Sequence, residues 1–243
     1  MSVDNFVNNC KLSTENSGFG GMETKNLLIV FAKQPVKGQV KTRLIPCFGA
    51  PRATIFYAFS LADTVRRFSQ SACYETCVCY SGERDYFSHC FPGIELIRQG
   101  VGNLGQRLQQ ILNKQLDVGW QRVCVVGSDS PDLPTEWIIE AFDKLNSTDV
   151  VTIPASDGGY VLLGVRVDSA PLCQNISWSS DQVLQQTQQQ AQQAGYSYRQ
   201  LHQWHDIDTK VDLYQLVQRS GQLAGCRSAK YAMRCLRQAA SNK

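Results

Sequence analysis

Positively charged residues gather in the segment FAKQPVKGQVKTRL (31–44), which directly follows an apolar run. A proline and a glycine, Pro35 and Gly38, interrupt this segment and are expected to shape it into a loop. In such a loop an arginine can hold a phosphate through forked hydrogen bonds, and a lysine can hold it as a point charge. The alternative is a solvated charged loop. The candidates for phosphate binding are Lys33, Gly38, Lys41 and Arg43, with Lys37 further out.

Two other segments place carboxylates after predicted strands. GSDSPDLP (127–134) carries Asp129 and Asp132, and HDIDTKVDL (205–213) carries Asp206 and Asp208. A carboxylate at a strand tip can bind Mg²⁺ that also holds a pyrophosphate, and alternate residues of an extended segment point the same way. We therefore expect Asp129, Asp206 and Asp208 to bind Mg²⁺ or Mn²⁺. Turn formation or helix capping is the alternative, and it suits Asp132 better than Asp129.

Two glycine-containing loops could approach a ligand closely. GNLGQRL (102–108) places Asn103 at a predicted helix start, where an anion or a ribose could bind. SDGGYVLLG (156–164) places Asp157 before Gly158 and Gly159. Ordinary turn chemistry explains both loops equally well. No Walker A motif is present in the sequence.

Apolar patterns that alternate between strand and helix predict how these loops are positioned. Strands are expected at 27–32, 76–80, 94–97, 122–127, 149–155, 160–165 and 196–201. Helices are expected after Pro51, from Asn103, from Thr135 as N-cap, in the glutamine-rich stretch 181–195, and in two closing segments, 209–218 and 229–238. This order predicts an α/β fold with a mostly parallel central sheet and helices on both faces. Ligands of such folds bind beyond the carboxyl ends of the strands.

Length and composition favour one large domain, with two small domains as the alternative. The chain has 243 residues and a formal net charge of +3, too small for a nucleic-acid-binding surface. Residues 1–24 are rich in Asn, Ser and Gly without an apolar h-region, so we expect a disordered leader before a domain at 25–243, with Met22 as an alternative start. With no apolar run of membrane-spanning length, a cytoplasmic protein is expected. The ten cysteines are expected to be reduced and mostly buried, although Cys73, Cys77 and Cys79 could hold a metal.

Six segments in order resemble a known family: LIVFAKQPVKGQVKTRL, GNLGQRL, GSDSPDLP, PASDGGYVLLG, ISWSSDQVLQQT and DIDTKVDL. They look like the bacterial GT-A-type nucleotide-diphospho-sugar transferases, some of which are linked to arsenosugar biosynthesis. The resemblance spans about Leu27 to Leu216. KTRL with DIDT is more distantly similar to phospholactate guanylyltransferase and molybdenum-cofactor nucleotidylyltransferases. The family has GDLG where this chain has GNLG, so no charged role carries over to Asn103.

The resemblance implies a fold and an activity. It implies a single GT-A domain in which Lys41 and Arg43 hold phosphates, Asp129 holds the metal, and Asp206 or Asp208 completes the metal site. We expect a sugar to pass from a nucleotide-diphospho-sugar to a small acceptor; nucleotidyl transfer with release of pyrophosphate and a non-catalytic nucleotide-binding domain are the alternatives. Asp157 is the candidate for orienting or deprotonating the acceptor. The acceptor side is expected to include Gly158, Gly159, Tyr160, Trp178 and Ser180.

Overall fold

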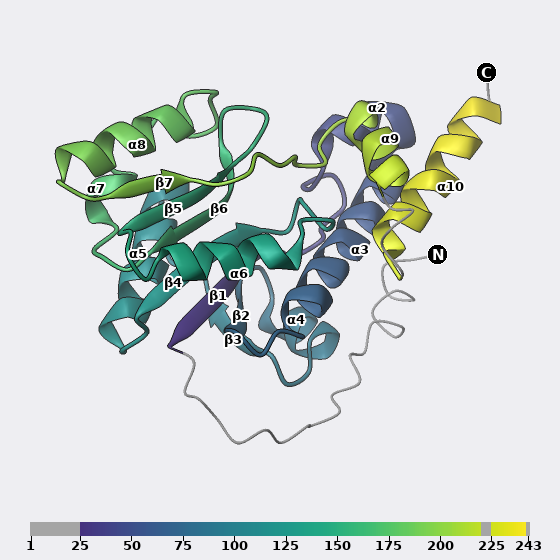
Figure 1. The fold of residues 1–243 in the computed structure, drawn as a ribbon. Helices are drawn as coiled ribbons and strands as arrows, with labels where there is room; N and C mark the ends of the chain where they lie inside the picture. Colours follow the sequence, from purple (N-terminus) through teal and green to yellow (C-terminus); the bar gives the residue numbers. More distant parts are fainter. Residues whose placement is uncertain (1–24, 220–224, 242–243) are drawn as a thin grey trace.

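A seven-stranded sheet forms the centre of the computed structural model, which describes residues 25–219 and 225–241 (Figure 1). The strands are β1 (Asn26–Lys33), β2 (Glu75–Ser81), β3 (Glu95–Arg98), β4 (Arg122–Gly127), β5 (Val150–Pro154), β6 (Tyr160–Val165) and β7 (Tyr198–Gln200). Their spatial order is β3-β2-β1-β4-β6-β5-β7, and β6 runs antiparallel to both of its neighbours. The predicted mostly parallel α/β sheet is therefore confirmed. The expected leader, 1–24, lies outside the described residues.

The apolar strands are buried on both faces of the sheet. Along β1, Leu28 and Val30 enter one hydrophobic cluster, whereas Leu27 and Ile29 enter another on the opposite face. Such alternation explains why this strand reads as a continuous apolar run. The same alternation places Cys77 and Cys79 together in the second cluster. No disulfide joins the cysteines of the described residues, and most of them are buried, as predicted.

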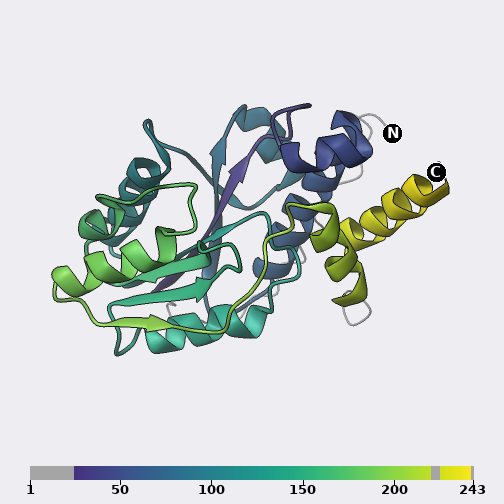
Figure 2. The same ribbon diagram turned by 90° about the horizontal axis from the view of Figure 1, so that it is seen from above.

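Helices cover both faces of the sheet. The first cluster is closed by α3 (Ala50–Phe68), α4 (Arg84–Cys90) and α6 (Thr135–Lys144), and the second by α5 (Leu104–Asp117), α7 (Ala170–Cys173) and α8 (Val183–Gln193). Figure 2 shows these two layers from above. The short helices α4 and α7 were not predicted, because so few residues show no helical period.

A third cluster lies beside the sheet, where the closing helices α9 (Lys210–Arg219) and α10 (Arg227–Ser241) pack near α3 (Figures 1 and 2). The short helix α2 (Ile45–Phe48), which follows the cationic segment, contributes to the same cluster. The closing helices therefore pack against the elements that follow the predicted phosphate loop. None of the helices in the described part of the chain has the length and apolar character needed to span a bilayer.

Helix starts differ from prediction at one place and agree at another. The expected N-cap Thr135 is the first residue of α6, and Pro134 stands at the cap position without a side-chain hydrogen bond. Asn103 does cap α5: its side chain accepts a hydrogen bond from the Gln106 backbone, and Gln106 reciprocates in a capping box. The side-chain oxygen of Asn103 is therefore already hydrogen-bonded to the first turn of α5.

Candidate active site

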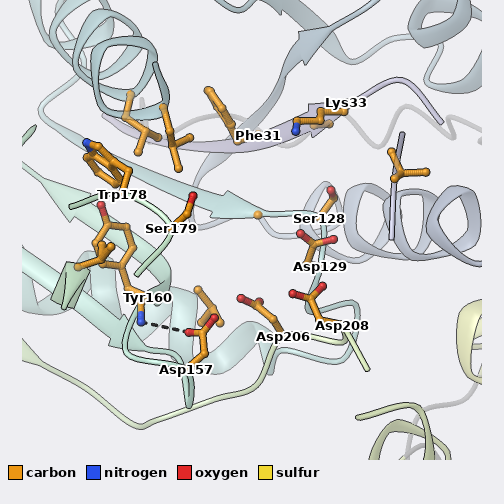
Figure 3. A pocket seen from close by; sticks show the side chains of 18 of the residues that line it. Phe31, Lys33, Ser128, Asp129, Asp157, Tyr160, Trp178, Ser179, Asp206 and Asp208 are labelled. Carbon is orange, nitrogen blue, oxygen red and sulfur yellow. Dashed lines mark hydrogen bonds between the residues drawn. The ribbon is translucent and has the colours of Figure 1, made fainter. Parts of the chain in front are cut away.

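A cleft of about 820 Å³ opens where β1 and β4 end and β6 begins. It contains most of the predicted site residues, although they come from segments far apart in the sequence. The cleft is lined by Lys33, Lys41, Arg43, Asp129, Asp157, Gly159, Tyr160, Trp178, Ser180, Asp206 and Asp208. In Figure 3 the three aspartates Asp129, Asp206 and Asp208 lie together on one side, and Tyr160 and Trp178 lie across from them.

Lys41 bridges two of the predicted metal ligands. Its Nζ lies 2.7 Å from Asp129 Oδ1 and 2.9 Å from Asp208 Oδ1, and its side chain is only 2% exposed. Burial alone would lower the pKa of Lys41, but the two adjacent carboxylates outweigh burial and raise it. Lys41 is therefore a permanently charged ammonium between two carboxylates. The sequence predicted a phosphate as its partner, whereas in this structure the partners are the expected metal ligands.

The backbone of Lys41 is also unusual. Its φ of 46° and ψ of 45° lie in the left-handed region, just before the 3-10 turn η1 (Thr42–Leu44). A residue with a side chain pays roughly 1–2 kcal/mol for this conformation, which persists only where surrounding contacts impose it. The two ion pairs of the ammonium are contacts of this kind.

Asp206 has different surroundings. It accepts a hydrogen bond of 2.7 Å from the Ser130 hydroxyl, which also lies 3.0 Å from the His205 carbonyl oxygen. Enclosure by protein atoms, and then the negative charge of Asp129, raise the pKa of Asp206 to about 7. This carboxyl group therefore gains or loses a proton near neutral pH.

The carboxylates are held together by the backbone. The Ile207 amide donates a 3.0 Å hydrogen bond to the Asp129 carbonyl, which fixes the 206–208 segment against the loop after β4. Capping of α9 falls to Thr209 and Asp212, whose side chains exchange hydrogen bonds at the helix start. The Asp208 carboxylate is thus left to face Lys41.

The remaining cations are more exposed. Arg43 Nη1 lies 3.7 Å from Asp208 Oδ2, and the Arg43 side chain is 71% exposed. Lys33 lines the cleft at the end of β1. Gly38 does not line it: with φ of 81° and no atom within 4 Å of an added Cβ, it allows a turn. Its backbone freedom therefore shapes the loop.

Tyr57 on α3 was not identified from the sequence. Its hydroxyl accepts a 3.0 Å hydrogen bond from the Lys33 amide and pairs with Ser128 Oγ at 2.9 Å. Ser60 Oγ donates to the Ser128 carbonyl at 2.6 Å. The helix thereby ties the end of β1 to the end of β4. In the sequence Tyr57 stands among the apolar residues of an amphipathic helix, so nothing marked it as a site residue.

The opposite wall comes from the β5–β6 turn and the segment before α8. Asp157 is exposed, and its Oδ1 accepts a 3.1 Å hydrogen bond from the Gly159 amide. Burial raises the pKa of Tyr160, so its phenol stays neutral and cannot serve as a base near neutral pH. Ser179, with φ of 66°, and Asp181 also line this wall.

In both glycine-containing loops, other parts of the protein pack directly against a glycine. A Cβ on Gly105 would lie 2.4 Å from the Trp178 indole nitrogen, and one on Gly158 would lie 2.1 Å from the Asp181 carbonyl oxygen. The glycines therefore let the 178–181 segment settle onto α5 and the β5–β6 turn. Neither Gly158 nor Asn103 lines the cleft. At Gly105 and Gly158 the close approach is therefore made by the chain itself.

The carboxylates of Asp129 and Asp208 suit a divalent cation whose remaining coordination positions are filled by a bound ligand. Among the described residues, no group of three or more His, Cys, Asp or Glu side chains could hold a metal ion by itself. However, Asp129 and Asp208 already direct oxygens at one cation, the Lys41 ammonium. Mg²⁺ is commonly bound by one or two carboxylates together with phosphates and waters. The donor set therefore suits Mg²⁺ or Mn²⁺ bound together with a phosphate ligand.

Comparisons with known proteins agree with this fold. The structure of a protein from Desulfovibrio desulfuricans G20, provisionally described as a nucleotide-diphospho-sugar transferase, superposes with a TM-score of 0.80 at 31% identity. The match covers 90% of this chain and 96% of that one. Residues 64–180 match a family described as an uncharacterized protein conserved in bacteria, DUF2064. A search of curated proteins gives no match.

More distant structures share the fold alone. CMP:2-keto-3-deoxy-manno-octonic acid synthetase, complexed with CTP, has a TM-score of 0.50 at 13% identity, covering 81% of this chain and 98% of its own. A cytidylyltransferase from Leptospira borgpetersenii has a TM-score of 0.50 at 12% identity, covering 90% of this chain and 95% of its own.

The sheet order and the cleft at the strand ends define a Rossmann-like fold of the nucleotide-diphospho-sugar transferase type. The chain belongs to the bacterial GT-A-type nucleotide-diphospho-sugar transferase family, together with the Desulfovibrio protein.

Proposed function

We propose that the protein is a metal-dependent glycosyltransferase that moves a sugar from a nucleotide-diphospho-sugar to a small acceptor. The observation that carries this proposal is one cleft with cations and carboxylates at one side and an aromatic, hydroxyl-bearing wall at the other. The first side suits a diphosphate with its metal ion, and the second suits a polyol. The description of the Desulfovibrio protein supports the same assignment.

The diphosphate of the donor binds along the cationic loop. Lys33, Lys41 and Arg43 all line the cleft, so their charges can offset the negative charge that builds on the departing phosphate. Arg43 suits this task because most of its side chain is exposed to an incoming ligand. Its guanidinium can then bind two phosphate oxygens at once.

Asp129 and Asp208 would hold the Mg²⁺ or Mn²⁺ ion, with Asp206 beside them in the cleft. When bound, such an ion supplies positive charge at the phosphate oxygens of the leaving group. The Asp206 carboxylate is oriented by Ser130, and it contributes its charge fully only above its raised pKa of about 7. Only once it is ionised can it bind a cation.

The acceptor lies against Asp157, Tyr160, Trp178 and Ser180. Its hydroxyl oxygen forms the new bond to the anomeric carbon, while the bond from that carbon to the diphosphate breaks and its electron pair leaves with the nucleoside diphosphate. The hydroxyl proton passes to Asp157, whose Oδ1 is held by the Gly159 amide. Tyr160 takes no proton, since burial keeps its phenol neutral.

Nucleotidyl transfer is the second candidate. The observation that favours it is the number of cations in the cleft, since Lys33, Lys41 and Arg43 can also offset the charge of a triphosphate. In that reaction the acceptor would attack the α-phosphorus, and pyrophosphate would leave.

The leaving group distinguishes the two reactions. The protein is incubated with nucleotide-sugars and, separately, with nucleoside triphosphates, each with Mg²⁺ or Mn²⁺ and with a chelator as control. Metal-dependent release of nucleoside diphosphate from a nucleotide-sugar supports sugar transfer. Pyrophosphate release without any reaction of nucleotide-sugars would contradict sugar transfer and support nucleotidyl transfer. Nucleotide binding with neither product points to a non-catalytic binding domain.

A further inference from the structure

The Lys41 ammonium occupies the position at which a divalent cation would meet Asp129 and Asp208. Its two contacts, 2.7 Å and 2.9 Å, are made to one oxygen of each carboxylate. With 2% of its side chain exposed, Lys41 has little room to move aside while these contacts last. The segment before η1 thus brings a cation of the chain itself to the proposed metal ligands.

We infer that Lys41 and the divalent metal ion exclude each other at Asp129 and Asp208, so that the metal binds only after Lys41 has left these carboxylates. This inference rests on the proposed function, which assigns the metal to the same two residues. The reason is electrostatic and steric: two positive ions that need the same oxygens repel each other strongly in a partly buried site. A metal ion that arrives alone must displace the ammonium and leave it without a partner.

A phosphate ligand removes this obstacle. Lys41 lines the cleft with Lys33 and Arg43, so a bound diphosphate offers its ammonium new oxygens within the same space. The left-handed backbone of Lys41 is a conformation that costs energy and is maintained by the present contacts, which makes a change of conformation there easier. The phosphates thereby draw Lys41 away and at the same time complete the coordination of the metal.

The consequence is cooperative binding. Metal and nucleotide each raise the affinity of the protein for the other, because both favour the state in which Lys41 has left Asp129 and Asp208 and contacts the phosphates. Lys41 therefore lowers metal affinity in the nucleotide-free protein and raises phosphate affinity in the complex. A lysine that only bound phosphate would leave metal affinity in the nucleotide-free protein unchanged.

The test measures Mn²⁺ binding to the full-length, nucleotide-free protein by electron paramagnetic resonance. Lys41→Met should bind Mn²⁺ at least tenfold more tightly than the parent, because the ammonium no longer occupies one oxygen of each carboxylate. Lys37→Met is the matched control, because Lys37 is an exposed cation of the same loop. It should change Mn²⁺ affinity less than twofold. Adding Asp129→Asn to Lys41→Met should abolish the gain.

Equal Mn²⁺ affinity of the parent and Lys41→Met would overturn the inference, as would equal gains in the Lys37 and Lys41 variants. Circular dichroism checks folding, and Lys41→Gln, which keeps a polar side chain, repeats the test if the methionine variant unfolds. A failure of the proposed function is seen separately, as the absence of any metal-dependent product from nucleotide-sugars, and does not depend on the affinity comparison.

The parent protein offers a second measurement. Saturating Mn²⁺ without nucleotide should expose the Lys41 amine, so its acetylation by an amine-reactive ester, followed by mass spectrometry, should become several-fold faster. The acetylation of Lys37 serves as the internal reference and should stay constant. An unchanged rate at Lys41 while Mn²⁺ is bound would show that metal and ammonium coexist, which contradicts the inference.

Discussion

Asp206 differs from the two carboxylates beside it in its surroundings. Asp129 and Asp208 each contact the Lys41 ammonium, whereas the hydrogen bond of Asp206 comes from the neutral Ser130 hydroxyl. Aspartates of one cleft therefore have different partners, a cation for Asp129 and Asp208 and a neutral hydroxyl for Asp206. Asp206 should thus make stability depend on pH between about 4 and about 7.

The contribution of Asp206 to stability should fall as pH rises from about 4 to about 7. The pKa of Asp206 is raised from 3.8 to about 7 in the folded protein, so across this window the unfolded chain has lost its proton while the folded protein still holds it. Proton release thus favours unfolding as pH rises through the window. Asp206→Asn should reduce this decline, measured as the unfolding midpoint against pH. If parent and variant show parallel curves, the raised pKa is wrong.

Arg43 should contribute more to phosphate binding than Lys37. Arg43 lines the cleft, whereas Lys37 does not. Arg43→Ala should weaken binding of a nucleoside diphosphate by about 1.5–3 kcal/mol, the typical value of charged hydrogen bonds. Isothermal titration of Arg43→Ala and Lys37→Ala provides the comparison. Equal small losses would instead indicate a solvated charge cluster.

At the scale of elements, the 178–181 segment depends on two glycines that precede it in the chain. Gly105 belongs to α5 and Gly158 to the β5–β6 turn, and both would collide with this segment if they carried a Cβ. The wall of the cleft opposite the carboxylates is therefore positioned by close packing of the 178–181 segment against α5 and the β5–β6 turn.

Gly105→Ala should destabilise the protein only while Trp178 is present. Its Cβ would lie 2.4 Å from the indole nitrogen, so the tryptophan must move out of its place in the wall. In a Trp178→Ala background the same change should be neutral or stabilising, because alanine is favoured over glycine in a helix by about 1 kcal/mol. Denaturant unfolding of the four proteins measures this coupling. Additive effects would show that the two residues do not touch.

At the scale of the whole molecule, the closing helices are tied to the carboxylate loop. Arg219, the last residue of α9, donates from Nε to Asp132 Oδ2 at 2.7 Å and lies over the Trp204 ring. The Asp132 side chain is only 1% exposed. Asp132 therefore takes no part in helix capping, the alternative considered from the sequence, and instead connects the loop that carries Asp129 to the third hydrophobic cluster.

Arg219→Leu should destabilise the fold by about 3 kcal/mol, because it leaves the buried Asp132 carboxylate without its charged partner. The control is Lys210→Leu on the same helix, where only a contact between the ammonium and the Tyr214 ring is lost. That change should cost less than about 1 kcal/mol. Urea unfolding of both variants measures the difference, and similar small losses would mean that the Arg219 pair contributes little.

Local pattern was sufficient to predict most of the helices and strands and to select residues that line the cleft. Apolar runs and helical spacing predicted every strand to within a few residues, since burial on one or both faces imposes a period on the sequence. The rule that ligands bind beyond strand ends directed attention to Lys41, Asp129 and Asp208 before their positions were known. These inferences need only the residue types and their order along the chain.

Tertiary structure alone decided which residues are partners. Lys41 and Asp208 are separated by 167 residues, and no local pattern states that the ammonium will meet carboxylates before it meets a phosphate. Likewise, Gly105 and Gly158 suggested close approach of a ligand, but the 178–181 segment of the chain packs against them. Tyr57 was hidden because a buried hydroxyl in an amphipathic helix looks like part of the core. Contacts between distant segments depend on how the sheet and helices pack, so only the folded chain reveals them.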